Sequence, residues 1–137
     1  MLRLLILFMV ASALAQAQTC KPIAPDATDG VVASPANHRI LFETEDIRVL
    51  EITSAPHTAE KLHTHAMPAV MITDGFSTGT VTMEGKPPIQ HAPPADGQPR
   101  VVFLPAQSWH HAENLGDTPF HGIRIELKHQ EIGRAHV

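Results

Sequence analysis

The feature that most constrains the fold is a succession of short apolar segments, each bounded by turn-forming residues. From Arg39 onward, such segments occupy positions 40–42, 47–52, 69–72, 78–83, 100–104 and 120–127. Their lengths suit strands, and no stretch of ten or more residues after position 17 places apolar side chains at helical spacing. The chain is therefore expected to be all-β, as a sandwich or a barrel.

The segment 120–127 has the clearest pattern. Aliphatic residues at 123, 125 and 127 alternate with the charged residues Arg124, Glu126 and Lys128. Alternate residues of a strand point to opposite faces. This pattern predicts that the aliphatic face packs in the core and that the charged face meets water.

The stretch from Lys86 to Pro99 carries five prolines. Proline cannot donate to a sheet ladder, so this stretch is too rich in proline to form a central strand. We expect a mobile loop over one mouth of the barrel, or an edge of a sheet.

The ends of the chain differ in character from the middle. Residues 1–17 combine one arginine, a short apolar run and small residues at A-x-A spacing, which predicts a secretory signal peptide and a periplasmic or secreted protein. Residues 18–37 are expected to form an extended N-terminal arm, and 38–130 a single domain. Residues 131–137 resemble translated adapter sequence and are interpreted as a non-native tail.

Composition limits the partners and the cross-links. The net charge is −4 and no run of Lys or Arg occurs, so nucleic acid is not expected as a partner. The apolar run near the start is shorter than the roughly 20 residues that cross a bilayer, so no stable membrane span is expected in the mature protein. Cys20 is the only cysteine, which excludes an intramolecular disulfide.

The chain holds ten histidines, and three of them have informative positions. His63 and His65 are two residues apart, so on a strand they point to the same face and can reach one metal ion. His110 is a third candidate, and long-range sheet pairing would have to bring it to the first two.

These positions resemble the two halves of the cupin signature. The family carries H-x-H followed three or four residues later by Glu, and then P-x-G-x-x-H-x-x-x-N. Pro105, His110 and Asn114 match the second motif in register, with Gln107 at the position of the glycine. The segments 63–70 and 113–118 are similar to those of a set of small cupins. The resemblance implies a double-stranded β-helix, that is, a jelly-roll cupin barrel.

The sequence departs from the family at the glutamate. Ala69 and Val70 stand where that ligand would fall, so the usual site of three histidines and one glutamate cannot form. The resemblance then implies a divalent metal held by His63, His65 and His110, with Fe(II), Mn, Ni and Zn all open. Other side chains that could substitute as ligands are Glu60, His57, His91, His111 and Glu113. His111 follows His110 directly and is expected to point the other way.

Cupins host many chemistries, so the fold alone does not define the activity. One hypothesis is a metal-dependent enzyme, dioxygenase- or isomerase-like, that acts on a small organic substrate. The alternative is a non-catalytic module that binds a small ligand or buffers metal. The three histidines could also line a barrel that binds no metal. A third hypothesis is a structural or interaction protein, and a homodimer is compatible with all three.

Overall fold

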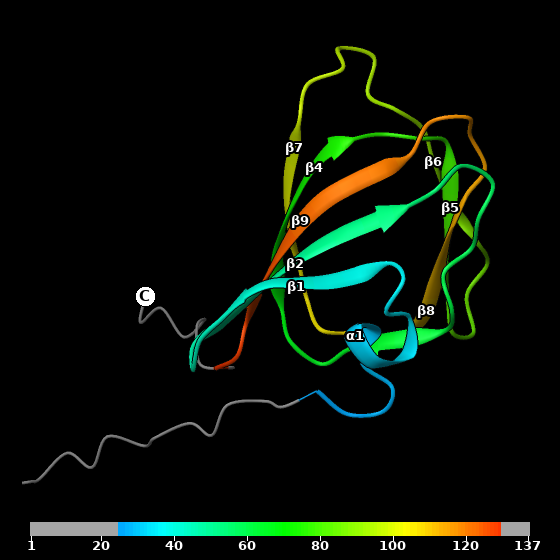
Figure 1. Cartoon of the computed structure of the whole chain (residues 1–137). Helices are drawn as coiled ribbons and strands as arrows, with labels where there is room; N and C mark the ends of the chain where they lie inside the picture. Colours follow the sequence, from blue (N-terminus) through cyan, green and yellow to red (C-terminus); the bar gives the residue numbers. More distant parts are fainter. Residues whose placement is uncertain (1–24, 130–137) are drawn as a thin grey trace, which may run out of the picture.

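The computed structural model describes residues 25–129, which form nine strands and one short helix in two antiparallel sheets. The first sheet has five strands, and Figure 1 shows it curving across one side of the molecule. Its spatial order is β1 (His38–Glu43), β2 (Ile47–Ser54), β9 (Phe120–Leu127), β4 (Ala69–Gly75) and β7 (Arg100–Leu104).

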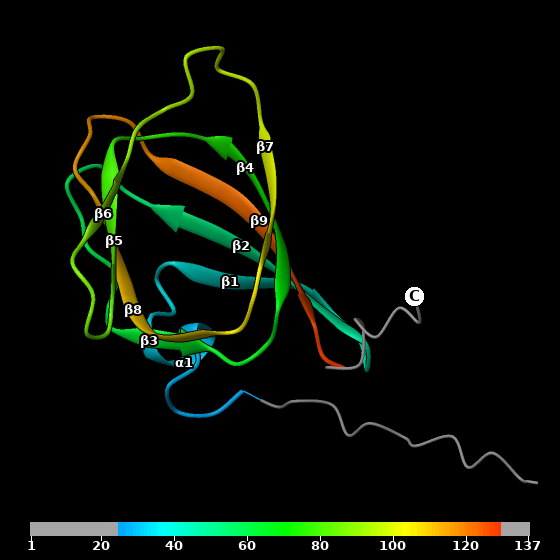
Figure 2. The same cartoon turned by 180° about the vertical axis from the view of Figure 1, so that it is seen from behind.

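The second sheet has four strands and faces the first (Figure 2). Its spatial order is β3 (His63–His65), β8 (Gln107–Asn114), β5 (Gly79–Met83) and β6 (Ile89–His91). The chain crosses between the sheets repeatedly, and this gives the predicted jelly-roll arrangement. In the region described, the two sheets are not joined into one closed hydrogen-bonded barrel.

The strand predictions agree well with the structure. β7 and β9 span the predicted ranges, and the other predicted segments lie within or overlap β1, β2, β4 and β5. The proline-rich stretch contains the short strand β6, which pairs only with β5 and so forms an edge, as proline content requires.

The described part of the N-terminal arm is not simply extended, because it contains helix α1 (Gly30–Ala33). Asp29 caps this helix by accepting a hydrogen bond from the Val31 amide at 3.1 Å. The preceding turn is tied to β3, because the Thr64 amide donates to the Thr28 carbonyl at 2.8 Å. The predicted signal peptide, Cys20 and the predicted tail at 131–137 lie outside the described residues.

The predicted polarity of β9 is wrong. Arg124 and Glu126 are 3% and 0% exposed and point into the molecule, whereas Ile123, Ile125 and Leu127 lie on the outer face and are only partly buried. Alternation defines two faces but does not say which one is inside. The charged face is inside because buried partners neutralise it: Arg48 Nε lies 2.5 Å and Arg124 Nε 3.0 Å from the Glu126 carboxylate.

The apolar core is correspondingly small. Leu50, Ile52 and Met71 form its buried part, and Val31, Leu104 and Phe120 pack against them. These side chains come from the inward side of the five-stranded sheet and from α1, and they lie beside the buried polar groups described below. No helix in residues 25–129 is long and apolar enough to cross a membrane.

Candidate metal centre

The structure brings together the three histidines singled out from the sequence. His63 pairs with His110 across β3 and β8, and the centroids of their rings are 4.4 Å apart. The His65 ring lies 5.1 Å from that of His63 and 5.5 Å from that of His110. All three residues are buried, at 0%, 3% and 5% exposure for His63, His65 and His110.

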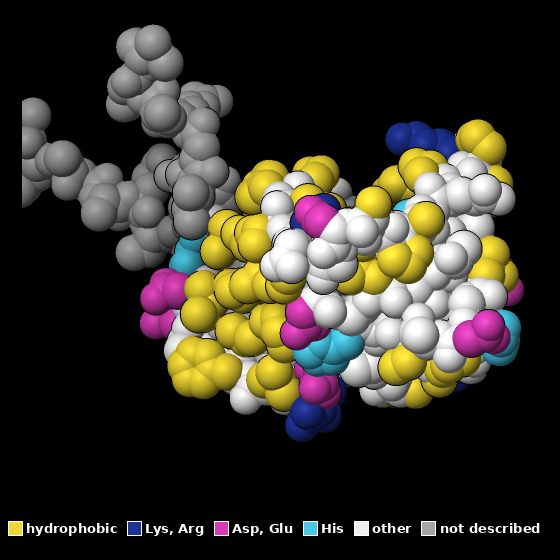
Figure 3. All heavy atoms as spheres, turned by 90° about the horizontal axis from the view of Figure 1, so that it is seen from above, with side chains coloured by type: hydrophobic (Ala, Val, Ile, Leu, Met, Phe, Trp, Pro, Cys, Tyr) yellow, Lys and Arg dark blue, Asp and Glu magenta, His cyan; other side chains and the backbone are white. Residues whose placement is uncertain are grey.

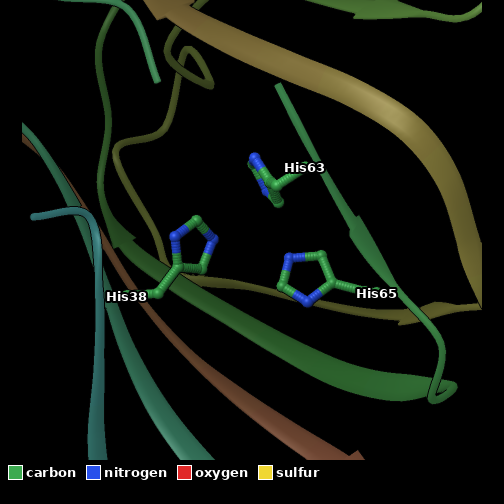
Figure 4. Close-up of side chains that lie close together, drawn as sticks. All are labelled: His38, His63 and His65. Carbon is green, nitrogen blue, oxygen red and sulfur yellow. The ribbon is translucent and has the colours of Figure 1, made fainter. Parts of the chain in front are cut away.

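A fourth histidine, which sequence reasoning missed, completes the cluster. His38 is the first residue of β1, and its ring lies 4.5 Å from His63 and 5.2 Å from His65. One ligand atom from each of these three residues lies within 4.8 Å of the others, and Figure 4 shows the rings grouped around a common space. His38 belongs to no motif and precedes the first predicted strand segment, 40–42, so no local signal marked it as a candidate ligand.

The orientation of all four rings is fixed through Nδ1. The acceptors are the carbonyls of Ser34 for His38 (3.0 Å), Lys61 for His63 (2.6 Å) and Ser108 for His110 (2.8 Å), and the Glu126 carboxylate for His65 (2.9 Å). A carbonyl oxygen only accepts, so Nδ1 must carry the proton in the first three rings. A carboxylate acceptor favours the same tautomer in His65. Each neutral ring therefore presents the lone pair of Nε2.

One of these nitrogen atoms is buried without a partner. His63 Nε2 makes no hydrogen bond with the described residues, and Arg48 Nη1 is the other such buried side-chain atom in that range. Burial of an unpaired polar atom costs about 1–3 kcal/mol. Coordination of a metal ion would satisfy this atom, so the donor set fits a metal site.

Burial also keeps the rings in the form that binds metals. Desolvation lowers the pKa of His38 and His110 to about 4 and that of His65 to about 3, and it lowers the pKa of His63 as well. At neutral pH all four rings are uncharged, and a metal ion has no proton to displace.

Glu126 connects the histidine cluster to a buried network of ion pairs. Its carboxylate accepts from His65 Nδ1 and from the guanidinium groups of Arg48 and Arg124, while Asp29 pairs with the other side of Arg48 at 2.8 Å. Burial alone would raise the pKa of Glu126, but the hydrogen bonds from His65 and Arg48 outweigh it and hold the pKa at about 2. Two arginines and two carboxylates thus balance in charge behind the histidines.

The structure also shows which carboxylates lie near the position of the missing cupin glutamate. Ala69 is fully buried, and it lies directly across from Glu126 on the neighbouring strand β9. The described carboxylate nearest to the metal-facing atom of His63 is Glu60, whose Oε2 is 3.9 Å from Nε2. The Glu60 side chain is only 6% exposed, and burial raises its pKa to about 7.

Two small adjoining cavities give access to the cluster. The first has a volume of about 120 Å³ between the sheets and is lined by all four histidines, Gln107 and Arg124. The second, of about 80 Å³, opens toward Ser77 and His91. The two share Glu60, Val81, Ala112 and Phe120 in their walls. Typical ligand pockets measure about 300–1,000 Å³, so only a small molecule fits.

The remaining sequence candidates lie away from the cluster. His57 is exposed and its Nε2 is 2.9 Å from Asp117. His91 and Glu113 are exposed beside the second cavity. His111 lines a surface groove with Trp109, away from the side of β8 on which His110 lies, as its position in the strand predicts.

Asn114 has the structural role that the sequence indicates. Its Oδ1 accepts from the Ser77 hydroxyl at 2.6 Å and the Gly116 amide at 3.0 Å. Its Nδ2 donates to the carbonyls of Ser54 and Thr118 at 3.0 and 2.9 Å. With both ends of the amide occupied, this side chain fixes the turn after β8.

Comparisons with known proteins agree on the fold. The chain matches no protein-family model, and curated proteins include no significant relative. Among solved structures, it is similar to a cupin domain from Bordetella pertussis (TM-score 0.55, 22% identity, 66% of this chain and 91% of that one). It is also similar to a cupin family protein with a double-stranded β-helix fold from Methanocaldococcus jannaschii (TM-score 0.54, 14% identity, 90% of this chain and 94% of that one). A third similar structure is a cupin-like protein from Thermotoga maritima, with a TM-score of 0.51 and 19% identity over 66% of this chain and 67% of that one.

The fold is therefore that of the cupins, a class of double-stranded β-helix proteins. In this chain the fold consists of one pair of sheets, and three buried histidines, His38, His63 and His65, lie close enough to hold a metal ion.

Proposed function

We propose that the protein is an exported, metal-dependent cupin enzyme that acts on a small organic substrate in a dioxygenase- or isomerase-like reaction. His63, His65 and His110, together with His38, would hold a divalent ion such as Fe(II), Mn, Ni or Zn. The predicted signal peptide supports export, and the small volume of the two cavities supports a small substrate.

The observation that carries the proposal is the buried, unpaired Nε2 of His63. Backbone carbonyls and Glu126 hold the four Nδ1 atoms, so the Nε2 atoms are left available. A purely packed histidine core has no need for four rings oriented in this way. Metal-binding histidines usually donate their other ring N–H to a carbonyl or carboxylate acceptor of this type.

The residues around the histidines define what the site can do. When bound, a divalent ion supplies Lewis acidity or activation of oxygen. Phe120 and Val81 form apolar parts of the wall shared by the two cavities, which exclude water from a substrate lodged there. The Glu60 carboxyl lies in the same wall, where it can accept or donate a hydrogen bond to a substrate hydroxyl or carbonyl.

Metal analysis of the purified, untagged protein tests the metal site. Mass-spectrometric metal content should be near one ion per chain in the wild type and should be lost in His63→Ala and His110→Ala. His38→Ala should weaken affinity by roughly tenfold or more, because it removes a ligand. His57→Ala is the matched control and should retain the metal. A wild-type protein that neither contains nor takes up Fe(II), Mn, Ni or Zn would contradict the proposal.

A second experiment separates an enzyme from a binding module. Small organic acids, sugars and phenols are first screened for thermal stabilisation of the metal-loaded protein. The stabilising compounds are then incubated with wild type and with His65→Ala under air. Product formed only by the wild type supports an enzyme, whereas binding without conversion supports the non-catalytic module.

A further inference from the structure

The cavity beside the histidines has a second polar side, formed by Arg124 of β9 and Gln107 of β8. Arg124 Nη1 donates to Gln107 Oε1 at 2.8 Å, and this hydrogen bond joins the two sheets across the interior. Arg124 is only 3% exposed, so its charge lies inside the molecule. Gln107 stands where the cupin motif has a glycine, so the pair is a feature of this chain and not of the motif.

Both side chains keep donors that no described residue accepts. A guanidinium has five N–H donors, and Arg124 makes three hydrogen bonds within residues 25–129: to Glu126 at 3.0 Å, to Gln107, and to the Met67 carbonyl at 3.4 Å. Arginine only donates, so the amide oxygen of Gln107 faces it and the amide NH2 is left free; within the same residues the Gln107 side chain makes no other hydrogen bond. The wall of the cavity therefore offers unused donors from two neighbouring residues.

The charges around the cavity favour an anion beside these donors. The two buried arginines and two buried carboxylates balance each other, so a divalent ion would add two positive charges to a neutral interior. Burial chiefly, and the positive charge of Arg124 in addition, lowers the pKa of all four histidines, so the guanidinium acts on the whole cluster. The same charge would repel an ion bound there, and an anion between the two would relieve that repulsion.

The donors suit a carboxylate better than a phosphate. A guanidinium N–H and an amide NH2 side by side match the two oxygens of a planar carboxylate. A phosphate carries more oxygen atoms and a second charge, and the buried Glu60 carboxyl in the same wall would oppose that charge. Ile52, Met71 and other apolar side chains complete the wall of this cavity of about 120 Å³, which suits a short carbon chain.

The part of the surface seen in Figure 3 offers no comparable anion site. The Lys and Arg side chains on that face lie at separate places instead of forming a patch, and the sequence contains no run of Lys or Arg. A single exposed cation attracts an anion weakly, because water screens its charge. The buried Arg124 is therefore a stronger anion site than that face.

We propose that Arg124 and Gln107 bind the carboxylate of a short-chain organic acid and direct the rest of the molecule toward the metal ion. The inference rests on the proposed function for the ion at the far end of the ligand. The carboxylate contact itself involves no candidate metal ligand, so the two can fail separately.

Isothermal titration of the Zn²⁺-loaded protein with glycolate and with glycolamide, its uncharged analogue, tests the inference. Glycolate should bind at least about tenfold more tightly than glycolamide, because hydrogen bonds to a charged group are the stronger ones. Gln107→Ala should weaken glycolate binding by about tenfold, and Gln107→Glu by about a hundredfold, because the second change sets two like charges side by side. Gln90→Ala is the matched control, because Gln90 is exposed on β6, and it should bind glycolate like the wild type.

Circular dichroism and metal content confirm that each variant is folded and loaded, and Gln107→Ala decides alone if Gln107→Glu does not fold. Unchanged glycolate affinity in Gln107→Ala overturns the inference, because the ion alone then holds the acid. Equal affinity for the acid and the amide, or binding of neither, overturns it as well. A wild type that takes up no metal contradicts the proposed function instead. The metal-free protein is then titrated in the same way, and a preference for glycolate that is lost in Gln107→Ala supports the carboxylate site, whereas its absence overturns it.

Discussion

At the scale of single residues, Glu126 combines two roles that are usually separate. Its carboxylate accepts a hydrogen bond from the metal-site residue His65 and neutralises two buried guanidinium groups, those of Arg48 and Arg124. Because all of these side chains are nearly inaccessible to water, the free energy of folding and the orientation of His65 depend on the same carboxylate.

Glu126→Gln should therefore affect stability and metal affinity together. The amide keeps the volume but leaves Arg48 with Asp29 as its acid partner and Arg124 with no paired acid among residues 25–129, so the free energy of unfolding should fall by about 3–5 kcal/mol. Metal affinity should fall by about 10–100-fold because His65 loses its anionic acceptor. Urea unfolding and competition with a chelating dye measure the two effects.

Glu51→Gln is the matched control for this change. Glu51 pairs with Arg39 at the surface, and the Arg39 side chain is 67% exposed, so the substitution should cost less than about 1 kcal/mol and leave metal affinity unchanged. Equal losses of stability in the two variants would show that the buried network contributes no more than a surface pair.

The limits of sequence reasoning are also clearest at individual residues. His63 and His65 could be singled out because strand geometry puts them on one face, and His110 because it matches a motif; they lie on the neighbouring strands β3 and β8. His38 could not, because nothing near it in the sequence distinguishes it from an ordinary strand residue, and only the pairing of β1 in the folded sheet carries it to the cluster. The inward position of Arg124 depends on the Gln107 side chain and the Met67 carbonyl, which accept its hydrogen bonds and are far away in the sequence.

At the scale of elements, α1 closes one side of the histidine cluster. A Cβ atom added to Gly30 would lie 3.0 Å from the Nε2 and Cδ2 atoms of His38 and 3.0 Å from Cε1 of His65. These contacts are tighter than ordinary packing, and one involves the nitrogen that faces the cluster. The absence of a side chain at Gly30 is what lets α1 approach the rings so closely.

Gly30→Ala should lower metal affinity by roughly tenfold, although alanine favours a helix by about 1 kcal/mol over glycine. The reason is that the new methyl group displaces the rings of His38 and His65. Isothermal titration with Zn²⁺ measures the affinity. Val32→Ala in the same helix is the control, because Val32 is 53% exposed and should be neutral. Undiminished affinity in Gly30→Ala would show that the rings move aside freely.

At the scale of the whole molecule, the buried histidines should make the metal-free protein sensitive to acid. Their pKa values lie at about 3–4 in the folded state for His38, His65 and His110, against about 6.5 in the unfolded chain. Below pH 6.5 the unfolded chain binds protons that the folded protein cannot, so stability is full above that pH and falls as the pH drops toward 4. Each histidine contributes up to about 1.4 kcal/mol per pH unit.

Glu60 acts in the opposite direction. Its pKa is raised to about 7 by burial, so between pH 4.5 and 7 the folded protein binds one proton that the unfolded chain does not. The three histidines with a pKa of about 3–4 outnumber it, so the folded and unfolded states should differ by about two protons, and the lowered pKa of His63 acts in the same direction. Urea unfolding of the metal-free protein at pH 7 and pH 5 measures how the free energy of unfolding depends on pH. This dependence should be weaker in His110→Gln and unchanged in His57→Gln. Equal stability at both pH values would contradict the prediction.

The all-β class was accessible from the sequence because strand lengths, prolines and turns are local signals, and the jelly-roll arrangement followed from the resemblance to cupins. The assignment of inside and outside was not, because it depends on what the opposite sheet presents. Here that sheet presents His65 and Gln107, which form hydrogen bonds with Glu126 and Arg124 across the interior. The aliphatic residues of β9 are consequently turned outward, where only another surface can cover them.

The origin of the four histidines has a further consequence. His38 comes from the five-stranded sheet, whereas His63, His65 and His110 come from the four-stranded one. An ion held by all four would cross-link the two sheets, through residues that lie near the beginning and near the end of the domain sequence. Its release would free the sheets to separate, expose backbone to proteases and shorten the lifetime of the protein. The amount of protein would then follow the supply of metal, and the protein would be scarce wherever the ion is scarce.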